Sequence, residues 1–215
     1  MFLTFVVAQF KKKATVFLSL ILIGLIIFGV IFYRDPKRII PTENDIIVSP
    51  ADGKVISIDT VYQGEVPFTV KNGKRIYLPE LKEYIDTDYT MISIFMGPFD
   101  VHVNRSPISG EVVDIIYIEG KYLPAFGDVL AENERNIIVI DGKIRTVTIQ
   151  IAGTFARRIN CYVDLDQALN MGDKIGMIRL GSQVVLIYPS KITTIVKVGD
   201  KVKAGESIIG EFELN

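Results

Sequence analysis

A run of twenty residues without a single charge, Ala14 to Tyr33, limits the fold of this chain more than any other feature. At a rise of about 1.5 Å per residue, a helix of this length covers the roughly 30 Å hydrocarbon core of a bilayer. A cleaved signal peptide has a shorter apolar stretch, about 7 to 15 residues, followed by a small-residue cleavage site. Here the charged sequence YRDPKR follows. We therefore predict an uncleaved membrane anchor in residues 1–35 and a separate domain in residues 36–215.

The charges around this run do not fix its orientation, because equal numbers of basic residues flank its two sides. They are Lys11, Lys12 and Lys13 before the run and Arg34, Lys37 and Arg38 after it. The apolar segment at residues 1–10 is expected either to lie in the membrane interface or to begin a second short hydrophobic segment.

The composition excludes several classes of function. Lys and Arg total 24 against 25 Asp and Glu, and no long basic arm is present, so we expect no nucleic-acid partner. Cys161 is the single cysteine and His102 the single histidine. The chain therefore cannot form an internal disulfide, and we expect no metal site.

After the anchor, short β-branched runs alternate with turn pairs, which is typical of an antiparallel, mainly β domain. The pairs are Asp52-Gly53, Asn72-Gly73 and Asp141-Gly142. Such pairs favour hairpins because both central positions of a type I′ turn need positive φ. We predict helix only as a turn or two in residues 78–88 and as a short helix in residues 164–173, ending near Gly172.

Two stretches resemble each other, Ser106–Ala125 and Ser190–Phe212, each with a strand, a glycine-centred turn and a second strand. The second also resembles the V-x-V-G-D-x-V-x-A-G hairpin of biotinyl and lipoyl domains. The tripeptide that carries their modifiable lysine does not occur here. The resemblance therefore implies a barrel-sandwich-like fold with lipoyl-like hairpins, and no carrier function.

Four places in the sequence carry residue types suited to chemistry, and each also has a structural explanation. They are Asp52, His102, the pair Arg157-Arg158 and the pair Gly181-Ser182. An aspartate before glycine is common in turns, and a histidine between two valines fits a strand. In an extended chain the two arginines point to opposite faces, and a Gly-Ser pair is ordinary at the start of a strand.

Taken together and in order, six segments resemble the short form of phosphatidylserine decarboxylase. They are FYRDPKRIIP, SPADGKV, GPFDVHVNRSPISGEV, ENERN, QIAGTFARRINCYV and GMIRLGSQVVL. The resemblance covers about Phe32 to Leu186, and several motifs in order are more specific than any one of them. It implies an enzyme that decarboxylates phosphatidylserine, or an ether-lipid analogue as in an archaetidylserine decarboxylase, to the ethanolamine lipid.

The resemblance also implies a cofactor made from the chain. The hydroxyl of Ser182 attacks the carbonyl of Gly181, the resulting ester is eliminated, and residue 182 becomes a pyruvoyl group. The mature protein is then a heterodimer of chains 1–181 and 182–215, with a homodimer as a further expectation. The pyruvoyl group forms a Schiff base with the amine of a phospholipid substrate, so neither a dissociable cofactor nor a metal is needed.

By the same resemblance, Ser182 is the nucleophile, His102 its base, and Asp52 the residue that orients His102. Longer family members have a second histidine where this chain has Arg105, so whether His102 serves self-cleavage, decarboxylation or both stays open. This chain also has Gln183 where threonine is common. Independently, charge suggests that Arg157, Arg158 or Arg105 binds the phosphate or carboxylate of the substrate.

Two other functions remain open on the residues alone. One is a membrane-anchored adaptor without activity, and the other is an anchored serine hydrolase that uses Ser182 with a lysine such as Lys191. For the enzyme, the resemblance and the lone Cys161 favour location at the cell membrane, with the catalytic domain on the cytoplasmic side.

Overall fold

The computed structural model describes residues 2–43, 45–71, 74–120, 133–153, 158–179 and 182–212. At residues 2–11, 71, 74 and 182 it describes the main chain only. The chain forms two compact units, Met1–Asp35 and Pro36–Asn215.

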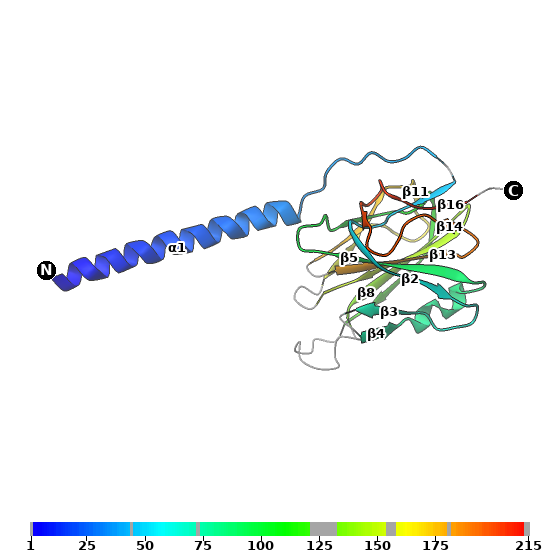
Figure 1. Cartoon of the computed structure of the whole chain (residues 1–215), viewed down its shortest axis with the longest axis horizontal. Coiled ribbons are helices and arrows are strands. Elements are labelled where there is room, and N and C mark those ends of the chain that lie inside the picture. Colours follow the sequence, from blue (N-terminus) through cyan, green and yellow to red (C-terminus); the bar gives the residue numbers. More distant parts are fainter. Residues whose placement is uncertain are drawn as a thin grey trace. The chain divides into compact units, whose positions relative to one another are not determined.

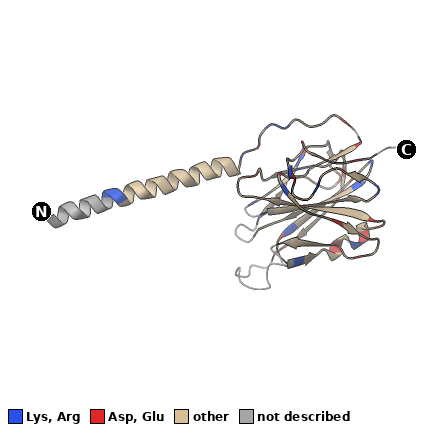
Figure 2. Cartoon of the chain, viewed as in Figure 1, with Lys and Arg blue, Asp and Glu red and all other residues tan. Residues whose placement is uncertain are grey.

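The first unit contains one helix, α1, over Phe2–Phe32. Its segment Lys12–Phe32 has a mean hydropathy of 2.9 and is long and apolar enough to cross a membrane. The first charged side chains described on this helix are those of Lys12 and Lys13. Figure 2 shows them as a basic band, with no charge from there to the end of the helix. Residues 2–10 continue the same helix and do not form a separate segment.

The second unit is mainly β, as expected, and is built on an eight-stranded antiparallel sheet (Figure 1). In order across the sheet its strands are β11 (Ala168–Leu169), β7 (Gly110–Ile118), β8 (Arg135–Gly142), β9 (Arg145–Ile151), β13 (Ser182–Pro189), β5 (Tyr89–Met96), β2 (Gly53–Val61) and β15 (Lys201–Val202).

Three smaller groups of strands and one 3-10 helix accompany this sheet. They are β1 (Ile46–Val48), β16 (Ile208–Glu211) and β14 (Thr193–Thr194); β10 (Ile159–Cys161), β12 (Lys174–Ile178) and β6 (Val103–Arg105); the hairpin of β3 (Phe68–Lys71) and β4 (Lys74–Tyr77); and η1 (Pro79–Tyr84).

The large sheet is buried on both faces. For this reason the sequence of β13, VVLIY, is apolar throughout and does not alternate with polar residues. Its Val184, Leu186 and Tyr188 belong to one hydrophobic cluster, whereas Val185 and Ile187 belong to another. The two three-stranded sheets supply the first cluster, and the β3–β4 hairpin with η1 supplies the second. Figure 1 shows β14 and β16 on one side of the layer of β13, β5 and β2, with β3 and β4 on the other.

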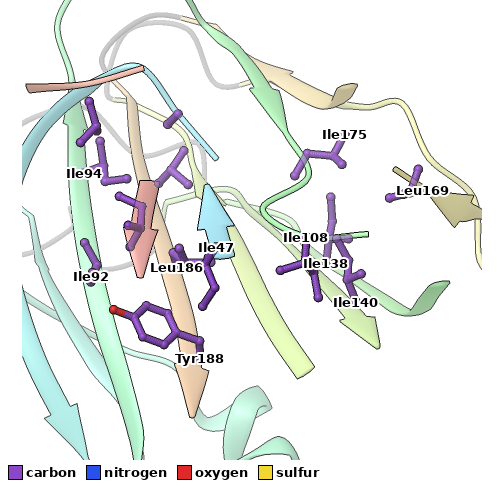
Figure 3. Packing of buried hydrophobic residues seen from close by; sticks show 14 of the residues in the cluster. Ile47, Ile92, Ile94, Ile108, Ile138, Ile140, Leu169, Ile175, Leu186 and Tyr188 are labelled. Carbon is purple, nitrogen blue, oxygen red and sulfur yellow. The ribbon is translucent and has the colours of Figure 1, made fainter. Parts of the chain in front are cut away.

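Figure 3 shows the first cluster, in which Ile47 of β1 lies near Leu186 and Tyr188 of β13. The hydroxyl of Tyr188 lies 2.6 Å from Oγ1 of Thr194. Burial raises the pKa of Tyr188 to about 12, so this core tyrosine stays neutral at physiological pH. The strand that begins at Ser182 is therefore fixed by packing on both faces.

The turn pairs predicted the hairpins only in part. The strands on either side of Asn72-Gly73 pair as expected, although these two residues lie outside the described part of the chain. β8 and β9 also form a hairpin, but Asp141 pairs with Arg145, so the loop is centred after the expected pair.

Asp52-Gly53 does not form a hairpin turn, which corrects the prediction. β1 pairs with β16, while β2 pairs with β5 and β15. Gly53 is required for a different reason, because a Cβ atom there would lie 2.2 Å from the carbonyl oxygen of Phe95. Its φ of +153° also disfavours other residues.

The predicted helix in residues 164–173 is wrong, whereas η1 confirms the predicted turn in residues 78–88. Ala168 and Leu169 instead pair with the start of β7 at the edge of the large sheet, which buries Leu169. The stretch Ser190–Phe212 is likewise more complex than one hairpin. β14 pairs with β16, whereas β15, which lies between them in the sequence, pairs with β2 of the large sheet.

Candidate active site

Four strands of the large sheet bring separate sequence motifs to one end of that sheet. Ser182 is the first residue of β13 and pairs with Met96, the last residue of β5. On the other side of β13 lies β9, which ends at Ile151. β2 begins beside β5 at Gly53, directly after Asp52. Asp52 and Ser182 are therefore placed at the same end of the sheet, on either side of β5.

His102 reaches this end through a tight turn that follows β5. The amide of Gly97 donates to Oδ2 of Asp100 at 2.7 Å, and the amide of Asp100 donates to the carbonyl of Gly97 at 3.0 Å. His102 comes two residues later and is fully buried. Its carbonyl accepts from the amide of Ile178 at 3.3 Å. His102 thus lies beside the segment that leads from β12 into Gly181 and Ser182.

The main chain fixes the tautomer of His102. Its Nδ1 lies 2.9 Å from the carbonyl oxygen of Asp100. Because a carbonyl oxygen can only accept, Nδ1 carries the proton in this contact. In the neutral ring Nε2 then keeps its lone pair, which is the form that a general base requires.

Asp52, expected to orient His102, has other contacts in the described structure. Its Oδ1 accepts from Nη2 of Arg38 at 2.8 Å and from the amide of Ala204 at 2.8 Å. The Arg38 side chain is 4% exposed, so this ion pair is well shielded from water. Asp52 therefore joins the segment that follows α1 to the turn before β16. The role of Asp52 toward His102 stays a prediction, and the carbonyl of Asp100 already performs the orienting contact.

The three candidate arginines lie in different surroundings. Arg105 is buried and donates from Nη1 to the carbonyl of Gly172 at 2.9 Å, a contact that ties it to the turn before β12. Arg158 is exposed, and its carbonyl accepts from the amide of Arg179 at 3.0 Å, three residues before Ser182. Arg157 lies outside the described residues, as do Gly181 and the side chain of Ser182.

The described residues also contain no group of three His, Cys, Asp or Glu side chains arranged to hold a metal ion.

Three buried carboxamides near this end were not anticipated from the sequence. Nε2 of Gln150 donates to Oδ1 of Asn104 at 2.8 Å, and Nδ2 of Asn136 donates to Oε1 of Gln150 at 3.0 Å. Nδ2 of Asn104 in turn lies 3.7 Å from Sδ of Met96, the residue paired with Ser182. The sequence feature that could have indicated this chain of amides is a polar residue at every second position of a strand, as in RTVTIQI.

The amide chain also explains a glycine in β12. A Cβ atom at Gly176 would lie 2.7 Å from Nε2 of Gln150. The same Cβ atom would lie 2.6 Å from the carbonyl oxygen of Asn160, so glycine lets β12 approach both the main chain of β10 and the carboxamide.

A second group of buried polar contacts involves Gln183, the residue after Ser182. Nε2 of Gln183 donates to Oγ1 of Thr69 at 2.7 Å, and Thr69 shares a 2.8 Å hydrogen bond with Ser93. All three side chains are buried. The structure thus gives a physical reason for glutamine at a position where threonine was expected, because its longer side chain reaches the β3–β4 hairpin.

Replacing Gln150 with leucine should destabilise the fold while preserving the size of the side chain. The change leaves the amides of Asn104 and Asn136 buried without their partner, and each unsatisfied group costs about 1–3 kcal/mol. The unfolding free energy of the full chain in detergent should fall by roughly 2–4 kcal/mol.

Thr148→Val is the matched control on the same face of β9. The Oγ1 atom of Thr148 is buried and has no hydrogen-bond partner within the described structure. Its removal should be neutral or stabilising. Equal losses of stability in the two variants would show that the amide chain contributes nothing.

Comparison with known proteins agrees with this arrangement. The model of the family described as phosphatidylserine decarboxylase matches residues 25–210. A putative archaetidylserine decarboxylase proenzyme of Methanocaldococcus jannaschii is 43% identical over 94% of this chain and 96% of its own length. A phosphatidylserine decarboxylase proenzyme of Chlorobium phaeobacteroides is 40% identical over 88% of this chain and 81% of its own.

The chain belongs to the phosphatidylserine decarboxylase family. The resemblance inferred from the six motifs is confirmed, and so is the expectation that the protein is a decarboxylase. Membership in the phosphatidylserine decarboxylase family does not favour the adaptor or the serine hydrolase.

Proposed function

We propose that this protein is a proenzyme that cuts itself between Gly181 and Ser182 and then decarboxylates the serine headgroup of a membrane phospholipid. The observation that carries the proposal is the position of Ser182 at the start of β13, with His102 beside the segment that leads to it. The names of the relatives support both the decarboxylase activity and the proenzyme.

In the cleavage step, the hydroxyl of Ser182 attacks the carbonyl carbon of Gly181, and the amide becomes an ester. A weak hydroxyl nucleophile needs a base, and Nε2 of His102 suits this role in the tautomer set by Asp100. Elimination releases Gly181 as a carboxylate and leaves a dehydroalanine at residue 182. Water then displaces ammonia, which gives the pyruvoyl group.

The residues present fit a pyruvoyl group at this position. After cleavage the new terminus remains part of β13, which pairs with β5 over Ser182–Pro189 and with β9 over five residues. These ladders and the contact of Gln183 with Thr69 hold the terminus in place without a peptide bond to Gly181.

When present, the pyruvoyl carbonyl supplies an electron sink for the electrons released as CO₂ leaves. The role proposed for His102 is to hold a proton at Nε2 and to return it to the headgroup carbon. Arg158 is exposed beside the same segment and suits the phosphate or carboxylate of the substrate, and Arg157 is proposed with it. The buried Arg105 is a weaker candidate because it donates to Gly172.

The proposed mature protein consists of chains 1–181 and 182–215, anchored in the cell membrane by α1, with the β domain on the cytoplasmic side. The apolar segment Lys12–Phe32 supports the anchor. The same serine headgroup occurs on diacyl and ether lipids, and the roles proposed for His102, Arg157 and Arg158 concern only that headgroup. Release of the protein by carbonate washing would contradict the anchor.

The test of the proposed function is the intact mass of the purified wild-type protein. Two chains are expected, ending and beginning at the Gly181–Ser182 bond, and the smaller should have the mass of a pyruvoyl terminus in place of serine. The smaller chain should also resist Edman sequencing until reductive amination restores a terminal amine. An active preparation consisting of one uncut chain with Ser182 intact would contradict the proposal.

A further inference from the structure

A row of four directly opposed residues crosses the large sheet at the end that contains Ser182. Lys201 of β15 pairs with Lys54 of β2, Lys54 pairs with Phe95 of β5, and Phe95 pairs with Gln183 of β13. Side chains of directly opposed residues project from the same face of an antiparallel sheet. The row therefore leads from the sheet edge to the residue that follows Ser182.

The two lysines of this row repel each other. Residues directly opposed in antiparallel strands lie about 5 Å apart, and like charges there are destabilising. Both lysines are exposed, and neither takes part in an ion pair within the described residues. An anionic partner outside the chain would relieve this repulsion.

The third member of the row is an aromatic ring exposed to water. Phe95 is 43% exposed, whereas the other residues of β5 are buried. Phe99 follows in the turn that leads to His102 and is 65% exposed. Burying such rings is favourable in proportion to the apolar area removed from water. The surface beside Ser182 thus combines exposed phenyl rings with unpaired positive charge.

We infer that this row, Lys54, Lys201 and Phe95, is a docking surface for an anionic lipid bilayer. The lysines contact lipid phosphates, and Phe95, together with Phe99 from the turn that follows β5, enters the interface between headgroups and acyl chains. A bilayer offers negative charge and an apolar layer within a few ångströms of each other, and basic and aromatic side chains bind such an interface together. Docking there would set the end of β13 against the layer that contains the headgroups.

The inference rests on the proposed function only in taking the substrate to be a lipid. Its test does not depend on catalysis. It can be made in a Ser182→Ala background, in which the proposed self-cleavage and the decarboxylation cannot occur, so failure of docking and failure of the chemistry are distinguishable.

The absence of tryptophan from the sequence gives the experiment a clean reporter. The full chain with Phe95→Trp is reconstituted in phosphatidylcholine vesicles, with or without about a third phosphatidylglycerol, that carry brominated acyl chains. We expect a blue-shifted emission and bromine quenching in the anionic vesicles. Each lysine near an anionic surface contributes about 1 kcal/mol, which is roughly a fivefold change in docked population. Lys54→Glu with Lys201→Glu should therefore lower the ratio of docked to undocked protein by at least about 25-fold.

Tyr62→Trp is the matched control, because Tyr62 is 58% exposed and directly follows the opposite end of β2. It should show neither the shift nor the quenching, although it is tethered to the same vesicles. The inference would be overturned if bromine did not quench the reporter at position 95, or if the two lysine substitutions left that quenching unchanged. An emission shift that follows protein concentration in detergent would also overturn it, because it would identify a second copy of the chain as the partner.

Discussion

Protein in which Ser182 is replaced by alanine should be recovered as one uncut chain of 215 residues without decarboxylase activity. Alanine lacks the oxygen that attacks Gly181 in the proposed mechanism, so neither the ester nor the proposed pyruvoyl group can form. Without its covalent electron sink the enzyme loses the whole catalysed pathway, and enzymes typically accelerate their reactions at least about 10⁶-fold. Activity should therefore fall to background. Intact mass and release of CO₂ from a serine phospholipid are the measurements.

Two further variants make the Ser182 result specific. Ser182→Cys keeps a nucleophile and should cleave slowly through a thioester. Ser190→Ala changes the serine just beyond the other end of β13, whose Oγ lies 3.1 Å from Oγ1 of Thr90, and should cleave like the wild type. Cleavage or turnover by Ser182→Ala would remove residue 182 from the mechanism.

The sequence predicted the parts of the fold that depend on local chemistry. The uncharged run Ala14–Tyr33 predicted a helix, and α1 covers it through Phe32. β-branched runs predicted strands, and Asn72-Gly73 predicted the β3–β4 hairpin. Asp52-Gly53 misled because the same pair that favours a tight turn also suits a close backbone approach, here to Phe95.

The partners of the site residues could not be predicted, because they are distant in sequence. Asp52 contacts Arg38 and Ala204, and the second of these lies 152 positions away. Gln183 reaches Thr69 across 114 positions. A sequence pattern identifies residue types suited to chemistry, whereas the contacts that orient them arise only from strand order.

The region around His102 illustrates this division. The role proposed for it as a proton carrier follows from the residue type, since histidine alone changes charge near neutral pH with an unperturbed side chain. The identity of its orienting group does not, because a main-chain carbonyl leaves no mark in the sequence. The contact with Asp100 becomes evident only when the turn after β5 is described.

Replacing His102 with alanine should abolish most decarboxylation even in molecules that have cleaved. His102 is the single histidine of the chain, and it is buried beside the segment that enters Ser182. A positioned acid or base contributes about 10² to 10⁴ in rate. Turnover for each pyruvoyl group, counted by mass spectrometry, should therefore fall by that factor, with a smaller change in KM because the loss concerns proton transfer.

Comparing cleavage with turnover decides which step uses His102. If the residue serves only decarboxylation, His102→Ala should accumulate both chains at the wild-type rate and still turn over slowly. If it serves both steps, cleavage should slow as well, and the few processed molecules should remain poor catalysts. His102→Gln keeps a polar side chain that cannot exchange protons near neutral pH and should match alanine in turnover. Wild-type turnover for each pyruvoyl group in either variant would assign the proton transfer to another residue or to water.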